Sequence, residues 1–500
     1  MAEIRAENTG GAATTLTVDL DAWPLSLDPY HVVDFNQALV LDALVDPLTR
    51  DEPHRPDRTT SSALAGLDTL DDEDRTWLLR PAPGQIWDDG TAVRPEEIAA
   101  GIHRAWGPTC LPLPAVHNTG GTGSPVTTRI VSGPDGTEAI ELRSALPLPY
   151  LPRLLAFPGA APVRETGDDW TASGPYRPVR ADRASGRIEL RRKPSRRTTP
   201  KTPERLVFQV HDRRADALAA YAAGRLDVVV NTGLTPDEFT AAAALPDATV
   251  HPLDMVCQLW IRPGLDTALA TPVGRRAFGT GFDRATAGVH LQGAVLPLSR
   301  YSELWEPSTG GTEATTAHTG PDGPLPARGR RAELSLTYAD FAPNGEAAAL
   351  VAAELQSRFG HRVRLRPLPY ARFARAAATL DYELLYCINP APLAHLAGYL
   401  TQFHSTAATG RALGLAEPVV DAALDRALRT SGAKESALAW REAETAVLAH
   451  APVVPLFRVN SVVLAPSGLG PAVAATGTVR LDVLTRTAVP DHYHRRAETA

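Results

Sequence analysis

The sequence is short of cysteine, of excess positive charge and of long apolar runs, and each shortage excludes a class of protein. Its 3 cysteines, Cys110, Cys257 and Cys387, lie far apart, so thiols alone can build neither a redox pair nor a zinc site. The formal net charge of -7 gives no reason to expect nucleic acid or an anionic membrane as a partner, because both require a basic face. No segment reaches the roughly 18 uninterrupted apolar residues of a membrane-spanning helix, so membrane insertion is not expected.

Catalytic signatures are missing as well. The patterns HExxH, GxSxG and GKS/T do not occur, which removes the common zinc, nucleophile and phosphate-loop sites. Asp88 and Asp89 are neighbours, but adjacent carboxylates in a turn diverge, so they do not favour a glycosidase pair. His395 and His404 stand too far apart along one stretch to face a common ligand. The sequence therefore predicts no cofactor and no metal site, and it favours a binding protein over an enzyme.

The first residues carry no export signal. MAEIRAENTGGAATTLTVDL has acids at Glu3 and Glu7 and no apolar run before its first predicted strand. The odd number of cysteines also fits a reducing compartment. We therefore expect the chain as it stands in the cytoplasm, and outside it if the true start lies upstream.

Apolar periodicity alternates between strands and helices along the chain. With 500 residues, of which 44% are hydrophobic, the sequence can fill two or three buried cores. ELSLTY, GEAAALVAAELQSRF and VRLRPLPY predict a strand, a helix and a strand in succession, after the long Gly, Thr and Pro-rich segment 307–331. This order is typical of an α/β protein.

The most informative segment is WLLRPAPGQIWDDGTAVRPEEIAAGIHRAW, residues 77–106. It predicts a strand, then turns at Pro83-Gly84 and Asp89-Gly90, then a helix that begins at Pro95 with acids in its first turn. None of its residues forms a nucleophile, metal cage or phosphate loop. The segment therefore indicates an architecture and not a chemistry.

Residues 77–106 and several other phrases resemble the family 5 extracellular solute-binding proteins, the peptide, dipeptide and nickel receptors of ABC importers. Their order along nearly the whole chain carries the resemblance, since each phrase alone is weak. The other phrases are WPLSLDPY at 23–30, SGPYR at 173–177, RLVFQVHDRRADALAAYAAGRLDVV at 205–229, GRRAFGTGFDR at 274–284 and AHAPVVPLFRVNSVVL at 449–464.

The resemblance implies an α/β, two-lobed periplasmic-binding-protein-like fold of type II, with a subdomain inserted in lobe I. It also implies that two or three strands cross between the lobes and form a hinge. The predicted parts are a flexible tail at 1–16, lobe I at 17–45, 166–254 and 455–490, its inserted subdomain at 46–165, and lobe II at 255–454.

Four candidate ligand contacts lie near the predicted crossings between the lobes. In VCQLWIRPG, strand alternation directs Trp260 and Arg262 to the same face, where Trp offers a rigid apolar surface and Arg a fork for a carboxylate. Core packing and a surface ion pair are the structural alternatives. Trp23 precedes the SLDP phrase and Tyr30 ends it, so both are further candidates.

A second group of candidates lies in LDYELLYCINPAPLAHLAGYLTQFHS, which resembles the family's strand and loop at the edge of the cleft. In peptide-binding members an acid in that loop pairs with the ligand's α-amine, because a buried ammonium needs an opposite charge. The matching residue is Asn389, or Ile388 in a shifted alignment, and neither is acidic. We therefore expect a ligand without a free amine, or one whose amine is held elsewhere. Tyr386 and Cys387 are further ligand contacts or packing residues of the strand.

The leading prediction is a monomeric solute-binding protein that captures a peptide-like or other small organic ligand between two lobes, with an ABC permease as its partner. The alternative is a fold retained in the cytoplasm as a biosynthetic enzyme of cyclase or condensation type, or as a ligand sensor. The candidate proton-transfer groups of such an enzyme are Tyr386, Cys387, His395 and Asp21.

Overall fold

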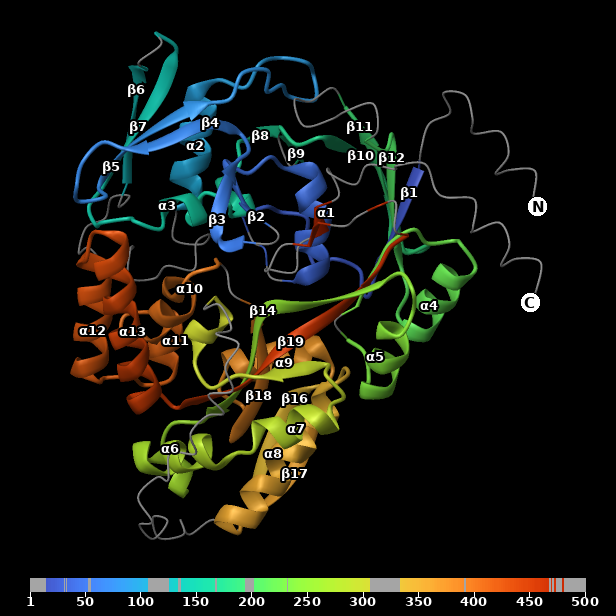
Figure 1. The fold of residues 1–500 in the computed structure, drawn as a ribbon, viewed down its shortest axis with the longest axis vertical. Helices are drawn as coiled ribbons and strands as arrows, with labels where there is room; N and C mark the ends of the chain where they lie inside the picture. The colour runs from blue at the N-terminus through green and yellow to red at the C-terminus, as the bar shows by residue number, and fades with distance from the viewer. Residues whose placement is uncertain are drawn as a thin grey trace.

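The computed structural model describes residues 15–30, 32, 34–52, 55–106, 126–133, 136–166, 169–193, 202–231, 233–305, 333–390, 393–466, 469, 472–473 and 479–480. In this part of the chain, helices and sheets form two lobes, with lobe I above lobe II in Figure 1. No helix among the described residues is long and apolar enough to cross a bilayer.

A four-stranded sheet forms one half of lobe I. Its order is β1–β12–β11–β10, in which β1 runs parallel to β12 and the other pairs are antiparallel. Val18 of β1 and Phe208 of β12 are buried in one core together with Leu41 of helix α1. The bounds are β1 Thr15–Leu20, α1 Phe35–Leu44, β10 Tyr176–Asp182, β11 Arg187–Arg192 and β12 Arg205–Val210.

The other half of lobe I contains a second four-stranded sheet, with the order β4–β5–β7–β6. Residues 77–106 form the predicted strand, turns and helix, and Gly84 and Gly90 have the positive φ angles, 79° and 83°, that the turns require. The bounds are β2 Thr49–Glu52, β3 Arg55–Ser61, β4 Leu64–Thr69, β5 Thr76–Pro81, α2 Pro95–Ala105, β6 Val126–Ser132, β7 Glu138–Ser144, α3 Leu151–Leu154, η1 Pro158–Ala160, β8 Val163–Thr166 and β9 Asp169–Ala172.

Two long strands join the lobes. β14 (Ala248–Ile261) and β19 (Val453–Leu464) pair antiparallel from Ala248 opposite Leu464 to Trp260 opposite Val453. At one end β13 (Val229–Asn231) pairs with β19, and at the other β18 (Leu384–Pro390) pairs with β14. β19 is buried along nearly its whole length, as expected for a strand covered on both faces. The two strands form the connection that a hinge requires (Figure 1).

Lobe II is built on the same large sheet. β16 (Glu333–Ala339), α8 (Asn344–Phe359) and β17 (Arg362–Leu368) form a parallel βαβ unit, which confirms the predicted succession of strand, helix and strand. Gly360 ends α8 in the left-handed conformation with φ 67°. The remaining bounds are α4 Arg214–Ala222, α5 Pro236–Ala243, η2 Ala268–Ala270, α6 Pro272–Gly281, α7 Arg284–His290, β15 Val295–Pro297, η3 Tyr301–Leu304, α9 Tyr370–Ala378, α10 Leu396–Leu400, η4 Thr401–Phe403, α11 Ala408–Ala412, α12 Pro418–Arg429, α13 Ala433–His450, β20 Ala472–Val473 and β21 Val479–Arg480.

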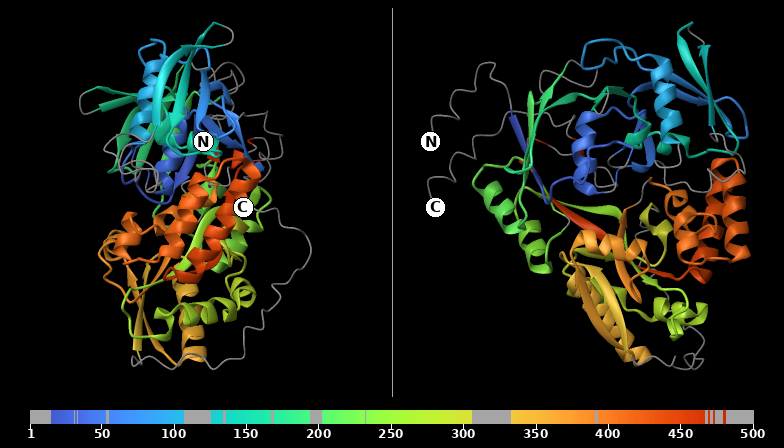
Figure 2. Two further views of the ribbon diagram at one scale, coloured as in Figure 1. Left: turned by 90° about the vertical axis from the view of Figure 1, so that its left-hand side faces the viewer. Right: turned by 180° about the vertical axis from the view of Figure 1, so that it is seen from behind.

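The lobes are packed against each other on the side of helices α10 to α13. Figure 2 shows these orange helices next to the lower edge of lobe I in both views. One apolar cluster extends from Trp77 of β5 to Trp440 of α13, and the ring of Tyr150 lies 6.2 Å from that of Trp440. The predicted boundaries between lobe I and lobe II, at residues 254 and 454, fall within β14 and β19, and both strands continue from one lobe into the other. The division into lobes at these residues stays a prediction.

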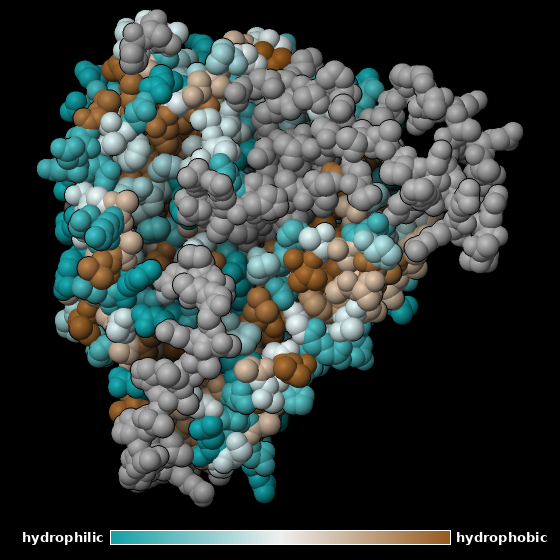
Figure 3. Space-filling view, in the orientation of Figure 1, coloured by the Kyte–Doolittle hydropathy of each residue, from teal (hydrophilic) through white to brown (hydrophobic). Residues whose placement is uncertain are grey.

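The outer surface has no single dominant apolar patch on the face drawn in Figure 3. Brown apolar residues are scattered among teal polar ones in the part of the chain that the structure describes. The most exposed large apolar side chains, Leu25, Val273 and Val289, belong to different segments.

Candidate functional site

A cavity of about 560 Å³ lies between the two lobes. Lobe I contributes the loop and helix from Asp21 to Val45, strand β2 and the turn from α3 to η1. Lobe II contributes residues of β14, β18 and β19, the residue Phe341 and the first residue of α9. Because both lobes form its wall, a rotation about the hinge would change its shape.

Aromatic side chains from both lobes line the cavity. Trp23, Phe35 and Phe157 belong to lobe I, and Phe341 and Tyr370 belong to lobe II. Rings offer large and rigid contact surfaces, so this wall suits an organic ligand with apolar parts.

The SLDP loop is fixed against helix α1 by hydrogen bonds. Asp34 caps the helix, since its carboxylate accepts from the backbone N–H groups of Gln37 at 2.8 Å and Leu25 at 3.1 Å. Asn36 Nδ2 donates to Asp21 Oδ1 at 2.5 Å, and Asn36 Oδ1 accepts from the backbone N–H of Asp21. Burial raises the pKa of Asp34, although its backbone hydrogen bonds oppose the rise. These contacts place Trp23 at the cavity.

Two arginines of the cavity wall are neutralised by their own carboxylate partners. Arg50 of β2 forms a buried ion pair with Asp42 of α1 and also donates to Ser62 Oγ at 3.1 Å. Arg214, at the start of α4, forms a buried ion pair with Asp19 of β1. These pairs connect elements of lobe I and rigidify the wall.

Asp51 of β2 has a different environment. Its Oδ1 atom is buried and has no hydrogen-bond partner among the described residues. Burial raises the pKa of Asp51 to about 6; nearby Arg153 opposes the rise and the like charge of Asp254 adds to it. Asp254 itself accepts from Arg458 at 2.8 Å and from Trp305 Nε1 at 2.7 Å.

Arg153 connects the lobes beside Asp51. It belongs to α3 of lobe I and lines the cavity, and its Nη1 donates to the backbone carbonyl of Ala394, just before α10. This hydrogen bond exists only when the lobes are together, so it stabilises the arrangement that encloses the cavity.

Of the seven predicted ligand contacts, Trp23 lines the cavity. The Tyr30 hydroxyl bonds to Arg104, whose guanidinium lies 4.9 Å from the ring centre. Trp260 packs against Phe403, with ring centres 6.3 Å apart. Arg262 lies outside the cavity lining, where its backbone N–H donates to the Glu383 carbonyl at 2.9 Å.

The residues predicted on β18 lie beside the cavity and not on its wall. Tyr386 is buried in the lobe II core and Cys387 in a small apolar cluster, where burial raises the pKa of the Cys387 thiol. The Asn389 carbonyl accepts from the Tyr399 hydroxyl at 2.5 Å. Ile388, the residue of the shifted alignment, lines the cavity. Strand alternation explains this difference between adjacent residues.

The candidate proton-transfer groups do not converge. Asp21 lines the cavity, whereas Tyr386 and Cys387 are in the core. His395 stacks on Tyr150 with ring centres 4.7 Å apart, and burial lowers its pKa to about 3, so the ring stays neutral. No acid and base pair of this set faces a common space.

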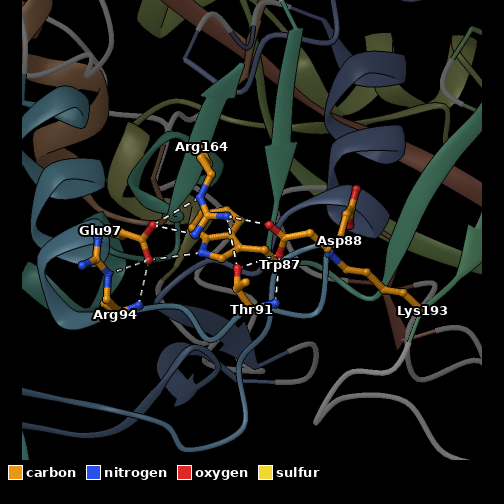
Figure 4. Close-up of polar contacts among 8 residues, drawn as sticks. Trp87, Asp88, Thr91, Arg94, Glu97, Arg164 and Lys193 are labelled. Carbon is orange, nitrogen blue, oxygen red and sulfur yellow. Dashed lines mark hydrogen bonds and ion pairs between the residues drawn. The ribbon is translucent and has the colours of Figure 1, made fainter.

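The side-by-side carboxylates of the 77–106 segment serve architecture (Figure 4). Asp88 pairs with Lys193 at 2.5 Å, while Asp89 pairs with Arg164 at 3.1 Å. The Arg164 guanidinium lies 4.5 Å from the ring centre of buried Trp87. Burial favours a higher pKa for Glu97, but hydrogen bonds from Arg94, Arg164 and Trp87 hold it below its ordinary value. As expected, the two carboxylates diverge: Asp89 ties the turn to β8, and Asp88 ties it to Lys193, which follows β11.

Sequence reasoning missed Asp51, Arg153 and most of the aromatic wall. Asp51 stands in the short strand TRDE, where a charged residue usually faces solvent. Phe157 and Tyr370 are isolated aromatic residues in segments without a recognisable phrase. No local signal marks these residues, because their common location depends on how the lobes meet.

No protein-family model and no curated protein sequence matches the chain. Solved structures do match. The Haemophilus influenzae OppA complex with RPPGFSPFR has a TM-score of 0.74 at 16% identity, with 96% of this chain and 100% of that chain covered. AgaA from A. tumefaciens R10, in complex with agropinic acid, has a TM-score of 0.72 at 15% identity, with 96% and 100% covered. A substrate binding protein from Microbacterium hydrocarbonoxydans, complexed with 4-hydroxybenzoate hydrazide, has a TM-score of 0.70 at 17% identity, with 95% and 100% covered.

These matches confirm the predicted fold. The chain has the two-lobed α/β fold of the periplasmic solute-binding proteins over nearly its entire length. At such low identity the likeness concerns the fold alone. The ligand has to be argued from the cavity of this chain.

Proposed function

We propose that the protein is a solute-binding protein that captures a small organic ligand between its lobes and delivers it to an ABC-type importer. The observation that carries the proposal is the cavity whose wall comes from both lobes. A ligand that contacts both walls stabilises the arrangement in which they meet, so binding free energy shifts an equilibrium between lobe arrangements.

The cavity favours a small molecule or a short peptide-like compound. Its volume of about 560 Å³ lies within the range of roughly 300 to 1,000 Å³ that is usual for small-molecule sites. The proteins of the same fold carry ligands that differ widely in size, from RPPGFSPFR to 4-hydroxybenzoate hydrazide. We infer that this chain belongs at the small end of that range.

Delivery to an importer gives the proposal two further parts. An ABC permease is the partner, and it contacts the surfaces of both lobes when they are closed. The protein then works outside the cytoplasm, because a receptor must meet its solute before the solute crosses the membrane. Fractionation of cells that produce the protein checks this location.

Two variants test the proposal. Ala38→Trp fills the cavity from helix α1, and Ala219→Trp places the same side chain on the exposed face of α4. We expect wild type and Ala219→Trp to retain a co-purifying small molecule, identified by mass spectrometry, and to become more compact in X-ray scattering when it is added back. We expect Ala38→Trp to lose both. Wild-type protein without any bound molecule, and without any ligand-dependent compaction, would contradict the proposal.

A further inference from the structure

Two aromatic side chains of lobe II are left open to water at the wall of the cavity. Phe341 is 43% exposed and Tyr370, the first residue of α9, is 45% exposed, and both line the cavity. They are the two most exposed aromatic side chains in the part of the chain that the structure describes. Folded proteins normally cover such rings, so an open pair of them at a cavity indicates a binding surface.

Lobe I contributes rings to the same cavity. Trp23 and Phe157 line it, and both are only partly buried. Burial raises the pKa of the Tyr370 hydroxyl, and the Asp34 carboxylate at the start of α1 adds to the rise. This effect requires that Tyr370 of lobe II lies close to the wall of lobe I. A flat group in the cavity therefore contacts rings of both lobes.

The three arginines of the wall are bound to partners within the protein. Arg50 forms an ion pair with Asp42, Arg214 forms one with Asp19, and Arg153 donates to a backbone carbonyl of lobe II. The wall as a whole holds five aspartates, Asp21, Asp34, Asp42, Asp51 and Asp212, against three arginines, Arg50, Arg153 and Arg214. An anionic ligand would meet this excess of negative charge and would compete with the partners of the arginines, so the wall disfavours it.

The aspartates of the wall are poorly placed for a cation. Asp21 and Asp34 already accept hydrogen bonds from Asn36 and from backbone N–H groups. The Oδ1 atom of Asp51 has less than 1 Å² of exposed surface, so it does not face the cavity. Asp212 is exposed to solvent, where water screens its charge. A cation would lose its hydration for weak or occupied partners, so it gains little in this cavity.

We propose that the ligand is uncharged and carries an aromatic ring, which lies between the rings of Trp23 and Phe157 in lobe I and those of Phe341 and Tyr370 in lobe II. This inference rests on the proposed function and names the ligand class of the same cavity. An uncharged molecule gives up little hydration when it enters the cavity, so the contacts between rings contribute directly to affinity. Free amino acids and unmodified peptides carry charges at both ends, and the wall disfavours them for that reason.

Displacement of a fluorescent probe separates charge from shape. N-phenyl-1-naphthylamine is aromatic and uncharged at neutral pH, and its fluorescence rises in apolar surroundings. We expect the full chain to bind this probe. Four competitors of similar size are then compared: 2-phenylethanol, 2-cyclohexylethanol, 2-phenylethylamine and 3-phenylpropanoate. We expect 2-phenylethanol to displace the probe at about tenfold lower concentration than either ion, and at about threefold lower concentration than the cyclohexyl alcohol.

Variants of the exposed rings test where the probe binds. Phe341→Ala and Tyr370→Ala should each weaken its binding by about fivefold or more. Both side chains are exposed, so their removal leaves the cores intact. Leu438→Ala is the matched control, because it removes an exposed apolar side chain of α13 outside the cavity lining. It should leave probe binding unchanged.

Four outcomes would overturn the inference: displacement by the amine or the carboxylate that equals or exceeds that by 2-phenylethanol, equal displacement by the two alcohols, or probe affinity that is unchanged in both Phe341→Ala and Tyr370→Ala. If an ion displaces the probe and compacts the protein in X-ray scattering, this inference fails while the proposed function stands. If the probe does not bind, the co-purifying molecule decides, and an ion or a molecule without an aromatic ring overturns the inference. If neither the probe nor any co-purifying molecule binds, both proposals fail.

Discussion

Replacing Asp51 by asparagine should stabilise the protein without ligand, although most substitutions of buried residues destabilise. The folded state raises the pKa of Asp51 from 3.8 to about 6, chiefly because burial disfavours the charged form. Asparagine keeps the shape and removes the charge.

The pH window follows from the direction of the pKa shift. Between pH 3.8 and about 6, the folded protein holds a proton that the unfolded chain has released, so the free energy of unfolding falls as the pH rises. Above this window the free energy of unfolding falls no further on account of Asp51. A pKa raised from 3.8 to about 6 corresponds to about 3 kcal/mol of stability. Partial exposure of the side chain reduces this to about 1 to 2 kcal/mol. Asp51→Asn does not titrate and avoids this loss.

Urea unfolding of wild type and Asp51→Asn at several pH values measures the difference. We expect the two proteins to have similar stability near pH 4 and the variant to be more stable by about 1 to 2 kcal/mol near pH 7. Asp42→Asn is the matched control, because it removes a carboxylate that is paired with Arg50. It should destabilise the protein by about 3 kcal/mol. A less stable Asp51→Asn, or a difference that does not grow with pH, would refute the argument.

Three further substitutions test the architecture around the cavity. Arg153→Gln removes the hydrogen bond between the lobes and should lower ligand affinity by about tenfold; unchanged affinity and unchanged X-ray scattering would contradict that role. Gly174→Ala should lower the free energy of unfolding by about 2 kcal/mol or more, because a Cβ there would lie 2.3 Å from backbone atoms of α1. Thermal unfolding measures the difference. Gly345→Ala is the control: its Cβ would have its nearest neighbour at 3.7 Å, so the variant should be as stable as wild type or more stable. Arg164→Gln should lower the free energy of unfolding in urea by about 1 kcal/mol. If the same substitution lowers it equally in a Trp87→Leu background, the contact between Arg164 and the Trp87 ring contributes nothing.

The architecture could be read from local patterns. Residues 77–106 contain a strand pattern, glycines where the backbone needs positive φ, and a proline where a helix begins, so each local preference agrees with the fold. The same agreement holds for the βαβ unit of β16, α8 and β17. The fold of most of the chain was therefore predictable.

The residues of the cavity wall were predictable only where a sequence phrase placed them. Trp23 lies beside the SLDP phrase, and Asp34 and Asn36 fix that loop to α1. Tyr386 and Cys387 have the residue types of a ligand site, but they lie on opposite faces of β18 and each is buried in an apolar cluster. Residue type alone does not distinguish a cavity wall from a core.

The sequence by itself determined the α/β succession of strands, turns and helices, because periodicity, turns and caps are properties of neighbouring residues. The two-lobed arrangement was implied by the resemblance that several sequence phrases carry. Only the tertiary structure decided that Asp51, Arg153 and the aromatic residues of both lobes share one cavity. These residues come from segments far apart in the chain, and long strands set their positions across the hinge. The charge state of Asp51 depends on burial and on Arg153 and Asp254, which are its neighbours only in the folded protein.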